Sequence, residues 1–164
     1  MGMNAPAAAG GFHIRQLVQV TGANETAEAF RPALNAAQWE ILGSYLQPLA
    51  VPSGRVVIQQ GDADRTVYLV EEGVLTVHYE DSAHRIRLAS VEAGSAVGEG
   101  AFFSRQPRNA TVQAAAACRL WTLSPLRFGE LSNRQPQVAL EVAMALGALV
   151  SRRLANRPKR VAVT

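Results

Sequence analysis

Glu99 and Arg108 are charged side chains that stand nine residues apart in a glycine-containing stretch, residues 98–112. The glycines on either side of the glutamate let the backbone approach a ligand and leave N–H donors exposed at a helix start, where an anion is favoured. An arginine can offer two parallel donors to a phosphate, and a carboxylate accepts hydrogen bonds from sugar hydroxyls. The stretch therefore predicts a site with separate partners for a phosphate and a sugar.

The order of residues in this stretch resembles the phosphate-binding cassette of cyclic-nucleotide-binding domains: Gly-Glu-x-Ala, six residues, then Arg-x-Ala-Thr-Val. Such domains occur in catabolite activator protein, in cyclic-nucleotide-gated channels and in regulatory subunits of cyclic-AMP-dependent kinase. The resemblance covers residues 35–154, because 52–62 and 67–73 also look like the family's first turns and strands. It implies that Arg108 pairs with the cyclic phosphate and that Glu99 holds the ribose 2'-hydroxyl. The remaining implied site residues are Gly98, Gly100, Ala101, Asn109 and Ala110.

Two positions differ from the residues common in the family and leave the base preference open. Gly100 replaces an aliphatic residue, which weakens the predicted short helix by about 1 kcal/mol relative to alanine. Asn109 replaces alanine, serine or threonine, and its side chain carries both a donor and an acceptor, which suits a phosphate oxygen or a purine edge. Cyclic AMP and cyclic GMP are both candidate ligands, and so is a cyclic dinucleotide.

The base needs a contact of its own, which in the family usually comes from the long C-terminal helix or the residues after it. Arg152, Arg153 and Arg157 are the candidates for this contact. The alternative for each is a solvated basic tail shared with Lys159 and Arg160. Arg157 precedes a proline, which disfavours a helix at that point. We therefore expect a shorter helix over the ligand than in transcription factors of this kind.

His78, Glu80 and His84 are a second group with metal-binding chemistry. Cupin enzymes use His-x-His on a similar barrel, whereas here a glutamate takes the second position and His84 lies across a predicted hairpin tip. We expect polar side chains on a solvated hairpin and no metal site. For no serine or cysteine does the sequence show a general base that would activate it as a nucleophile, or a residue that would orient that base. The sequence therefore predicts that the protein is not an enzyme.

The composition predicts one domain without a membrane segment. The chain has 164 residues, of which 48% are hydrophobic and 18% charged, enough for one core and too few for two full domains. No apolar run reaches membrane-spanning length and no signal peptide is recognisable, which predicts a cytoplasmic protein. The net charge of +3 is too weak to indicate nucleic-acid binding. Cys118 is the single cysteine; its apolar neighbours predict a buried thiol, and no intrachain disulfide is possible.

Hydrophobic periodicity and turn residues predict the elements that position the cassette. A short helix is expected over residues 12–20, and a second begins after Asn35, whose spacing to Gln38 predicts a capping box. The pattern then changes to short β-rich runs punctuated by glycine, which is typical of an antiparallel sandwich or barrel. The fold class is thus mainly β: an eight-stranded antiparallel jelly roll or barrel with N-terminal helices and a long C-terminal helix. The predicted strands are residues 55–59, 66–71, 74–79, 85–91, 110–115 and 119–123.

Two further helices are predicted after the strands, over residues 126–133 and from Pro136 to about Leu154. The longer helix is apolar on most sides, so it must bury more than one face. We expect a homodimer through residues 136–154; the alternative is packing only against its own barrel. No helix-turn-helix follows this helix, so we expect no sequence-specific DNA binding.

These expectations combine into a single domain flanked by a disordered tail, residues 1–11, and a basic tail, residues 156–164. Its expected parts are N-terminal helices over 12–48, strands with the cassette over 49–124, and C-terminal helices over 125–155. The predicted function is that of a stand-alone sensor of cyclic AMP or cyclic GMP. Ligand binding would set the position of the long helix and expose a surface for an effector protein. The alternative is a protein-interaction module that has kept the fold and lost nucleotide binding.

Overall fold

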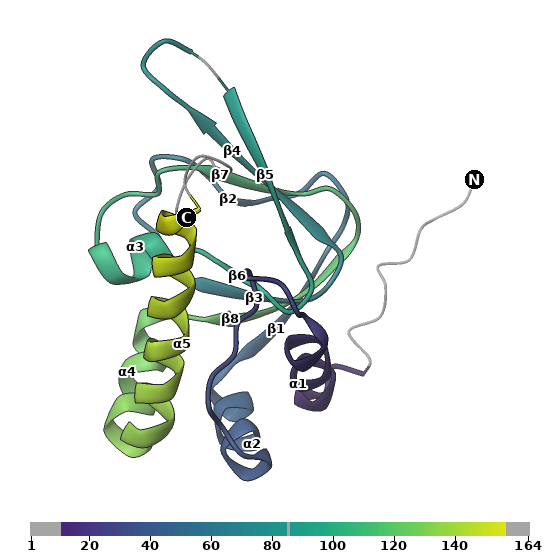
Figure 1. The fold of residues 1–164 in the computed structure, drawn as a ribbon, viewed down its shortest axis with the longest axis vertical. Coiled ribbons are helices and arrows are strands. Elements are labelled where there is room, and N and C mark those ends of the chain that lie inside the picture. Colours follow the sequence, from purple (N-terminus) through teal and green to yellow (C-terminus); the bar gives the residue numbers. More distant parts are fainter. Residues whose placement is uncertain (1–10, 85, 157–164) are drawn as a thin grey trace, which may run out of the picture.

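The computed structural model describes residues 11–84 and 86–156. Helices precede and follow a run of strands that is interrupted by one short helix, and Figure 1 shows the β4–β5 hairpin projecting furthest from the helices. In chain order the elements are α1 (Ile14–Ala23), α2 (Ala36–Tyr45), β1 (Gln47–Val51), β2 (Val56–Ile58), β3 (Val67–Glu72), β4 (Val74–Glu80), β5 (Ile86–Glu92), β6 (Ala96–Val97), α3 (Glu99–Ser104), β7 (Thr111–Ala114), β8 (Cys118–Leu123), α4 (Pro125–Arg134) and α5 (Pro136–Ala155).

The eight strands form two four-stranded antiparallel sheets. One sheet has the order β1-β8-β3-β6 and the other the order β2-β7-β4-β5. Strands distant in sequence are neighbours in both sheets, as in a jelly roll, which confirms the predicted class and strand number. The predicted barrel form needs a correction, because the sheets do not close on each other and the fold is a sandwich.

Two hydrophobic cores divide the domain into three layers. Between the sheets lie side chains such as Val70, Val112 and Leu120. On the other face of the first sheet, Leu69 and Trp121 pack against the helices. β3 and β8 contribute to both cores because successive side chains of a strand point to opposite faces. The first sheet is therefore buried on both faces, and the helices are fixed to it.

The helix ends follow local capping chemistry. The predicted capping box opens α2: Asn35 Oδ1 accepts from the Gln38 N–H at 2.8 Å, and Gln38 Oε1 accepts from the Asn35 N–H at 3.0 Å. α5 begins at Pro136, as predicted, because proline suits the first turn of a helix. α1 continues through residues 21–23, which were expected to end it, and stops at Asn24, whose side-chain amide donates to the Ala93 carbonyl at 2.9 Å.

Two short strands, β1 and β6, complete the predicted eight, because the sequence pattern located only six of them. β1 contains Pro48, which a strand tolerates at the edge of a sheet, and β6 has only two residues. The predicted tails, residues 1–11 and 156–164, lie outside the described residues apart from Gly11 and Asn156. In the described part of the chain, no helix has both the length and the apolar character needed to cross a membrane.

Candidate ligand-binding cassette

The predicted cassette connects the two sheets, from β6 through α3 to β7. Gly98 stands directly before α3 with a φ of 90°, a backbone region that residues with a Cβ rarely adopt. A Cβ at this position would lie 2.5 Å from the Thr66 carbonyl oxygen and 2.8 Å from Arg108 Nη1. The turn and the close passage of the arginine therefore both require glycine.

Arg108 is buried beneath this turn, with a side chain that is 1% exposed. Its Nη1 donates to the Gly98 carbonyl at 3.0 Å, and its Nη2 donates to the Thr66 carbonyl at 2.6 Å and to Asp64 Oδ2 at 2.8 Å. Its buried Nε has no hydrogen-bond partner among the described residues. Because a guanidinium has five N–H donors, this arginine keeps donors available for a further acceptor.

Asp64 balances the charge of Arg108 in this structure. Burial raises the pKa of this carboxyl, but hydrogen bonds from Arg108 and Thr66 and the guanidinium charge outweigh burial and hold the pKa below its usual value. The Asp64 side chain is half exposed. An anion that entered from solvent would therefore compete with a carboxylate that water can still reach.

Glu99 is fully buried, and its Oε1 accepts from Arg153 Nη1 at 2.6 Å. The same guanidinium donates from Nε to Glu28 Oε2 at 2.9 Å and from Nη2 to the Ala96 carbonyl at 2.8 Å. Burial lowers the pKa of Arg153, but the charges of Glu99 and Glu28 outweigh burial and raise it. One arginine of α5 thus joins the cassette, the strand before it and the segment between α1 and α2.

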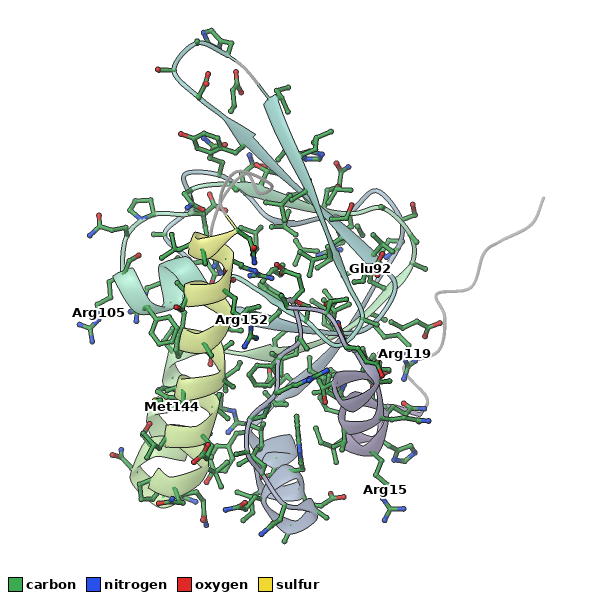
Figure 2. All side chains as sticks on the ribbon, viewed as in Figure 1. Arg15, Glu92, Arg105, Arg119, Met144 and Arg152 are labelled. Atoms are coloured by element: carbon green, nitrogen blue, oxygen red, sulfur yellow. The ribbon has the colours of Figure 1, made fainter. Side chains whose placement is uncertain are left out.

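Arg152 binds the same segment through backbone oxygens: its Nε donates to the Ala27 carbonyl at 2.7 Å and its Nη2 to the Ala29 carbonyl at 2.8 Å. Figure 2 shows this side chain at the end of α5. Both described candidates for the base contact are therefore engaged by the protein, and neither is a solvated tail residue. The third, Arg157, lies outside the described residues. Glu28 was not among the predicted site residues.

The other cassette residues border a pocket of about 430 Å³ between α3 and the last turns of α5. Gly100, Ala101 and Asn109 line it from the cassette, and Val150 and Leu154 line it from α5. Ala110 is buried at the start of β7. Arg108 and Glu99 are not among the residues that line this pocket, and Arg105, in the same loop, points away from the domain (Figure 2).

The residues considered for other chemistry are placed elsewhere. His84 Nδ1 and Glu80 Oε1 lie 2.8 Å apart on the exposed β4–β5 hairpin. Across residues 11–84 and 86–156, no three His, Cys, Asp or Glu side chains are arranged to hold a metal ion. Cys118 is buried, as predicted, and burial raises the pKa of its thiol.

The domain is thus a jelly-roll sandwich in which a turn, a short helix and a loop link the two sheets and carry a buried glutamate and a buried arginine. Comparison with known protein families gives the family. Residues 48–135 match the model of the cyclic nucleotide-binding domain, which is more than half of the chain. The chain belongs to the cyclic nucleotide-binding domain family.

Similar sequences occur within larger proteins. A cyclic nucleotide-gated potassium channel of Rhizobium etli is 36% identical over 110 residues, which are 67% of this chain and 29% of the channel. The acetyltransferase Pat of Mycolicibacterium smegmatis is 32% identical over 106 residues, which are 65% of this chain and 32% of that enzyme. The chain therefore spans less than a third of the length of these curated relatives.

Solved structures share the fold. A cyclic nucleotide-binding domain from Methylobacillus flagellatus KT superposes with a TM-score of 0.78 at 21% identity, over 91% of this chain and 85% of that one. The catabolite activator protein of Thermus thermophilus gives a TM-score of 0.68 at 26% identity, over 77% and 58% of the two chains. The regulatory domain of Toxoplasma gondii PKA with cAMP gives 0.60 at 25% identity, over 71% and 43%.

Proposed function

We propose that this domain binds a cyclic nucleotide, cyclic AMP or cyclic GMP, through the cassette. Arg108 holds the cyclic phosphate and Glu99 the ribose 2'-hydroxyl. The observation that carries the proposal is the buried guanidinium of Arg108, whose Nε lacks a partner among the described residues. An unpaired buried donor is costly, and a phosphate oxygen is the acceptor that a guanidinium binds best. Family membership supports the same ligand class.

Ligand binding would change the partners of both charged groups. A phosphate at Arg108 competes with Asp64, and a ribose hydroxyl at Glu99 shares the carboxylate with Arg153. Because Arg153 belongs to α5, this exchange offers a route from the ligand to the position of that helix. The size of such a shift depends on how much ligand affinity differs between the two helix positions. We propose that an effector protein recognises the resulting surface.

The experiment is titration calorimetry of cyclic AMP and cyclic GMP with the native chain and with Arg108→Ala. We expect the substitution to weaken binding by about 10–100-fold, because it removes charge-assisted hydrogen bonds worth about 1.5–3 kcal/mol. Arg105→Ala is the matched control, since this arginine of the same loop is exposed. Circular dichroism of the Arg108 variant checks its fold, and equal affinity of the two variants would refute the site.

The second candidate function is a protein-interaction module without a ligand. It is favoured by one observation: protein groups already occupy both Arg108 and Glu99 in this structure. Thermal unfolding with added nucleotide separates the two functions, because a ligand at 100 times its Kd raises the free energy of unfolding by about 2.7 kcal/mol. If the domain is a protein-interaction module without a ligand, added nucleotide should leave the free energy of unfolding unchanged. Neither function includes catalysis by this domain.

The proposed homodimer through residues 136–154 depends on the outward face of α5. Val138, Val142, Ala145 and Leu149 are buried against the domain itself. On the other face Leu140, Met144 and Leu154 are 52%, 64% and 53% exposed. Together with Gly147 these three residues lie on one face of α5, at the spacings of three, four and seven residues that are typical of helix–helix interfaces. We propose that the α5 of a second subunit packs on this face in a parallel orientation.

Met144→Asp should weaken this dimer at least about tenfold, because each subunit would bury a carboxylate at the seam. Sedimentation velocity over a concentration series measures the effect. Asn133→Asp, which adds a similar charge at an exposed position of α4, should leave the dimer unchanged. A native chain that sediments as a monomer at micromolar concentration would rule out the seam.

A further inference from the structure

The strand β5 forms one edge of its sheet, because β4 is its single neighbour among the described residues. The other three edges carry features that discourage pairing with a further strand: β1 contains Pro48, β6 has two residues, and β2 has three residues with a register shift against β7. β5 has seven residues in unbroken register with β4 and contains no proline. Long regular edges without such protection are templates for an added strand.

The open hydrogen-bonding groups of this edge can be assigned to individual residues. The Ala115 N–H donates to the Val74 carbonyl at 2.9 Å, so the even-numbered residues of β4 face β7 and the odd-numbered ones face β5. Their partners in β5 are residues 87, 89 and 91. The N–H groups and carbonyls of residues 86, 88 and 90 therefore point to the open edge. Such a row is complementary to an antiparallel copy of itself, because opposed residues exchange both of their hydrogen bonds.

The side chains beside this edge favour an apolar partner strand. Ile86 and Leu88 are 66% and 63% exposed and lie on the same face of β5, since they are two residues apart. Ser90 and Glu92 continue this face and are also exposed. Single exposed apolar residues are common on protein surfaces, but here two neighbours flank unpaired backbone groups. A strand that fits this edge therefore offers an apolar residue opposite Leu88.

We propose that the open edge of β5 binds the β5 edge of a second copy of this chain, as an antiparallel pair with its twofold axis at Leu88. In this register Leu88 stands opposite Leu88 of the second copy, and Ile86 stands opposite Ser90 of the second copy. Residues 86, 88 and 90 of each copy supply the hydrogen bonds. The two four-stranded sheets that contain β5 then join into one continuous sheet.

The neighbouring registers fit less well. Because only outward-facing residues can bond to one another, the twofold axis moves in steps of one residue along β5. An axis at residue 87 sets Arg87 opposite its own copy, and like charges directly opposite are destabilising. An axis at residue 89 sets Ile86 opposite Glu92, which pairs an apolar side chain with a carboxylate. The axis at Leu88 instead brings Glu92 to the hairpin tip of the second copy, which carries the polar side chain of His84.

The place of β5 in the fold leaves room for a second copy. The helices pack on the first sheet, whereas β5 is an edge of the second. Figure 1 shows the hairpin end of β5 extending beyond the rest of the sandwich, and Figure 2 shows Glu92 at the end of β5 nearer the helices. The contact is therefore separate from the cassette and from the proposed α5 interface, and it does not depend on nucleotide binding. Two twofold interfaces on one chain link more than two copies when both form.

Disulfide formation between copies tests the contact in the full chain. Directly opposed, hydrogen-bonded residues of antiparallel strands have Cα atoms about 5.5 Å apart, within the range that a disulfide spans. Under mild oxidation at equal concentration, Leu88→Cys should form a disulfide-linked dimer at least about tenfold faster than Val56→Cys. Val56 is an exposed residue on the opposite edge of the same sheet, and the native Cys118 is buried. Equal rates for the two variants would overturn the proposal.

A mixture of two cysteine variants tests the register. Ile86→Cys and Ser90→Cys set their thiols opposite each other only between chains of different kinds. Two copies of the same variant hold their thiols four residues apart along the strands, about 14 Å, which a disulfide does not span. The mixture should therefore form a linked heterodimer at least about tenfold faster than either variant alone forms a homodimer. Absence of this preference would contradict the axis at Leu88.

Sedimentation velocity tests the contact without cysteines, in the Met144→Asp chain so that the proposed α5 interface does not contribute. Because the contact is small, we expect this chain to dimerise at about 100 μM and above. Adding Leu88→Lys should weaken the dimer at least about tenfold, because two ammonium groups replace an apolar contact on the axis. Val56→Lys is the control and should leave the dimer unchanged. A Met144→Asp chain that stays monomeric up to about 1 mM, or equal effects of the two lysines, would refute the pairing.

Discussion

Arg153→Met is expected to lower the free energy of unfolding by about 3–5 kcal/mol, because it leaves buried carboxylate charge without a counterion. Glu99 is fully buried, and its Oε1 lies 2.6 Å from Arg153 Nη1. Methionine keeps much of the side-chain volume of arginine, so the loss of stability is caused more by the missing charge than by poorer packing. Urea unfolding followed by circular dichroism measures it.

Arg152→Met is the matched control for this experiment. This neighbouring arginine donates only to the carbonyls of Ala27 and Ala29 among the described residues, so we expect a cost of about 1 kcal/mol. Adding Glu99→Gln to Arg153→Met should recover part of the lost stability, since it removes the uncompensated charge. Equal costs for the two arginine variants, or no recovery, would contradict the importance assigned to the buried pair.

Glu71→Leu is expected to cost about 1–3 kcal/mol, because it leaves the buried indole N–H of Trp121 without an acceptor. Glu71 is 4% exposed; its Oε1 accepts from Trp121 Nε1 at 2.9 Å and its Oε2 from Arg119 Nε at 2.7 Å. Arg119 in turn lies 3.8 Å from the centre of the Phe12 ring and donates to the Gly11 carbonyl at 3.1 Å. The substitution should therefore also loosen the residues before α1.

Thermal unfolding and hydrogen exchange of residues 11–23 measure these two effects. Glu72→Leu is the control, because this adjacent carboxylate is 71% exposed and lies 3.9 Å from Arg119 Nε. We expect a change within about 0.5 kcal/mol for the control. If the Glu72 variant is destabilised as much as the Glu71 variant, the assignment to the buried hydrogen bonds is wrong.

The sequence alone was sufficient to predict the helices that are marked by capping or first-turn residues close to them in the chain. The capping box of Asn35 and Gln38 and the first-turn Pro136 both depend on neighbours a few residues away, and α2 and α5 begin where these signals predicted. β1 and β6 lacked such signals. Pro48 in β1 argues against a strand, and the two residues of β6 are too few to show an alternation of apolar and polar side chains. Closure of the sheets depends on how the edge strands lie in space, which no local pattern encodes.

The same distinction separates the predicted and unpredicted parts of the site. The cassette lies within fifteen consecutive residues, 98–112, and its glycine, glutamate and arginine were recognisable from their spacing. Asp64, which pairs with Arg108, is 44 residues away, and Glu28 is 125 residues from Arg153. Single acidic residues at such distances resemble any surface carboxylate, so only folding shows which of them meets a buried arginine.

Because one guanidinium is shared among several segments, we expect release of the last turn of α5 to be cooperative. The Arg153 side chain bonds Glu99 in α3, Ala96 in β6 and Glu28 before α2. One planar group makes all of these bonds, so withdrawal of the guanidinium from its site removes them together. Release of this turn is therefore expected as an all-or-none event, with a threshold in place of a graded response.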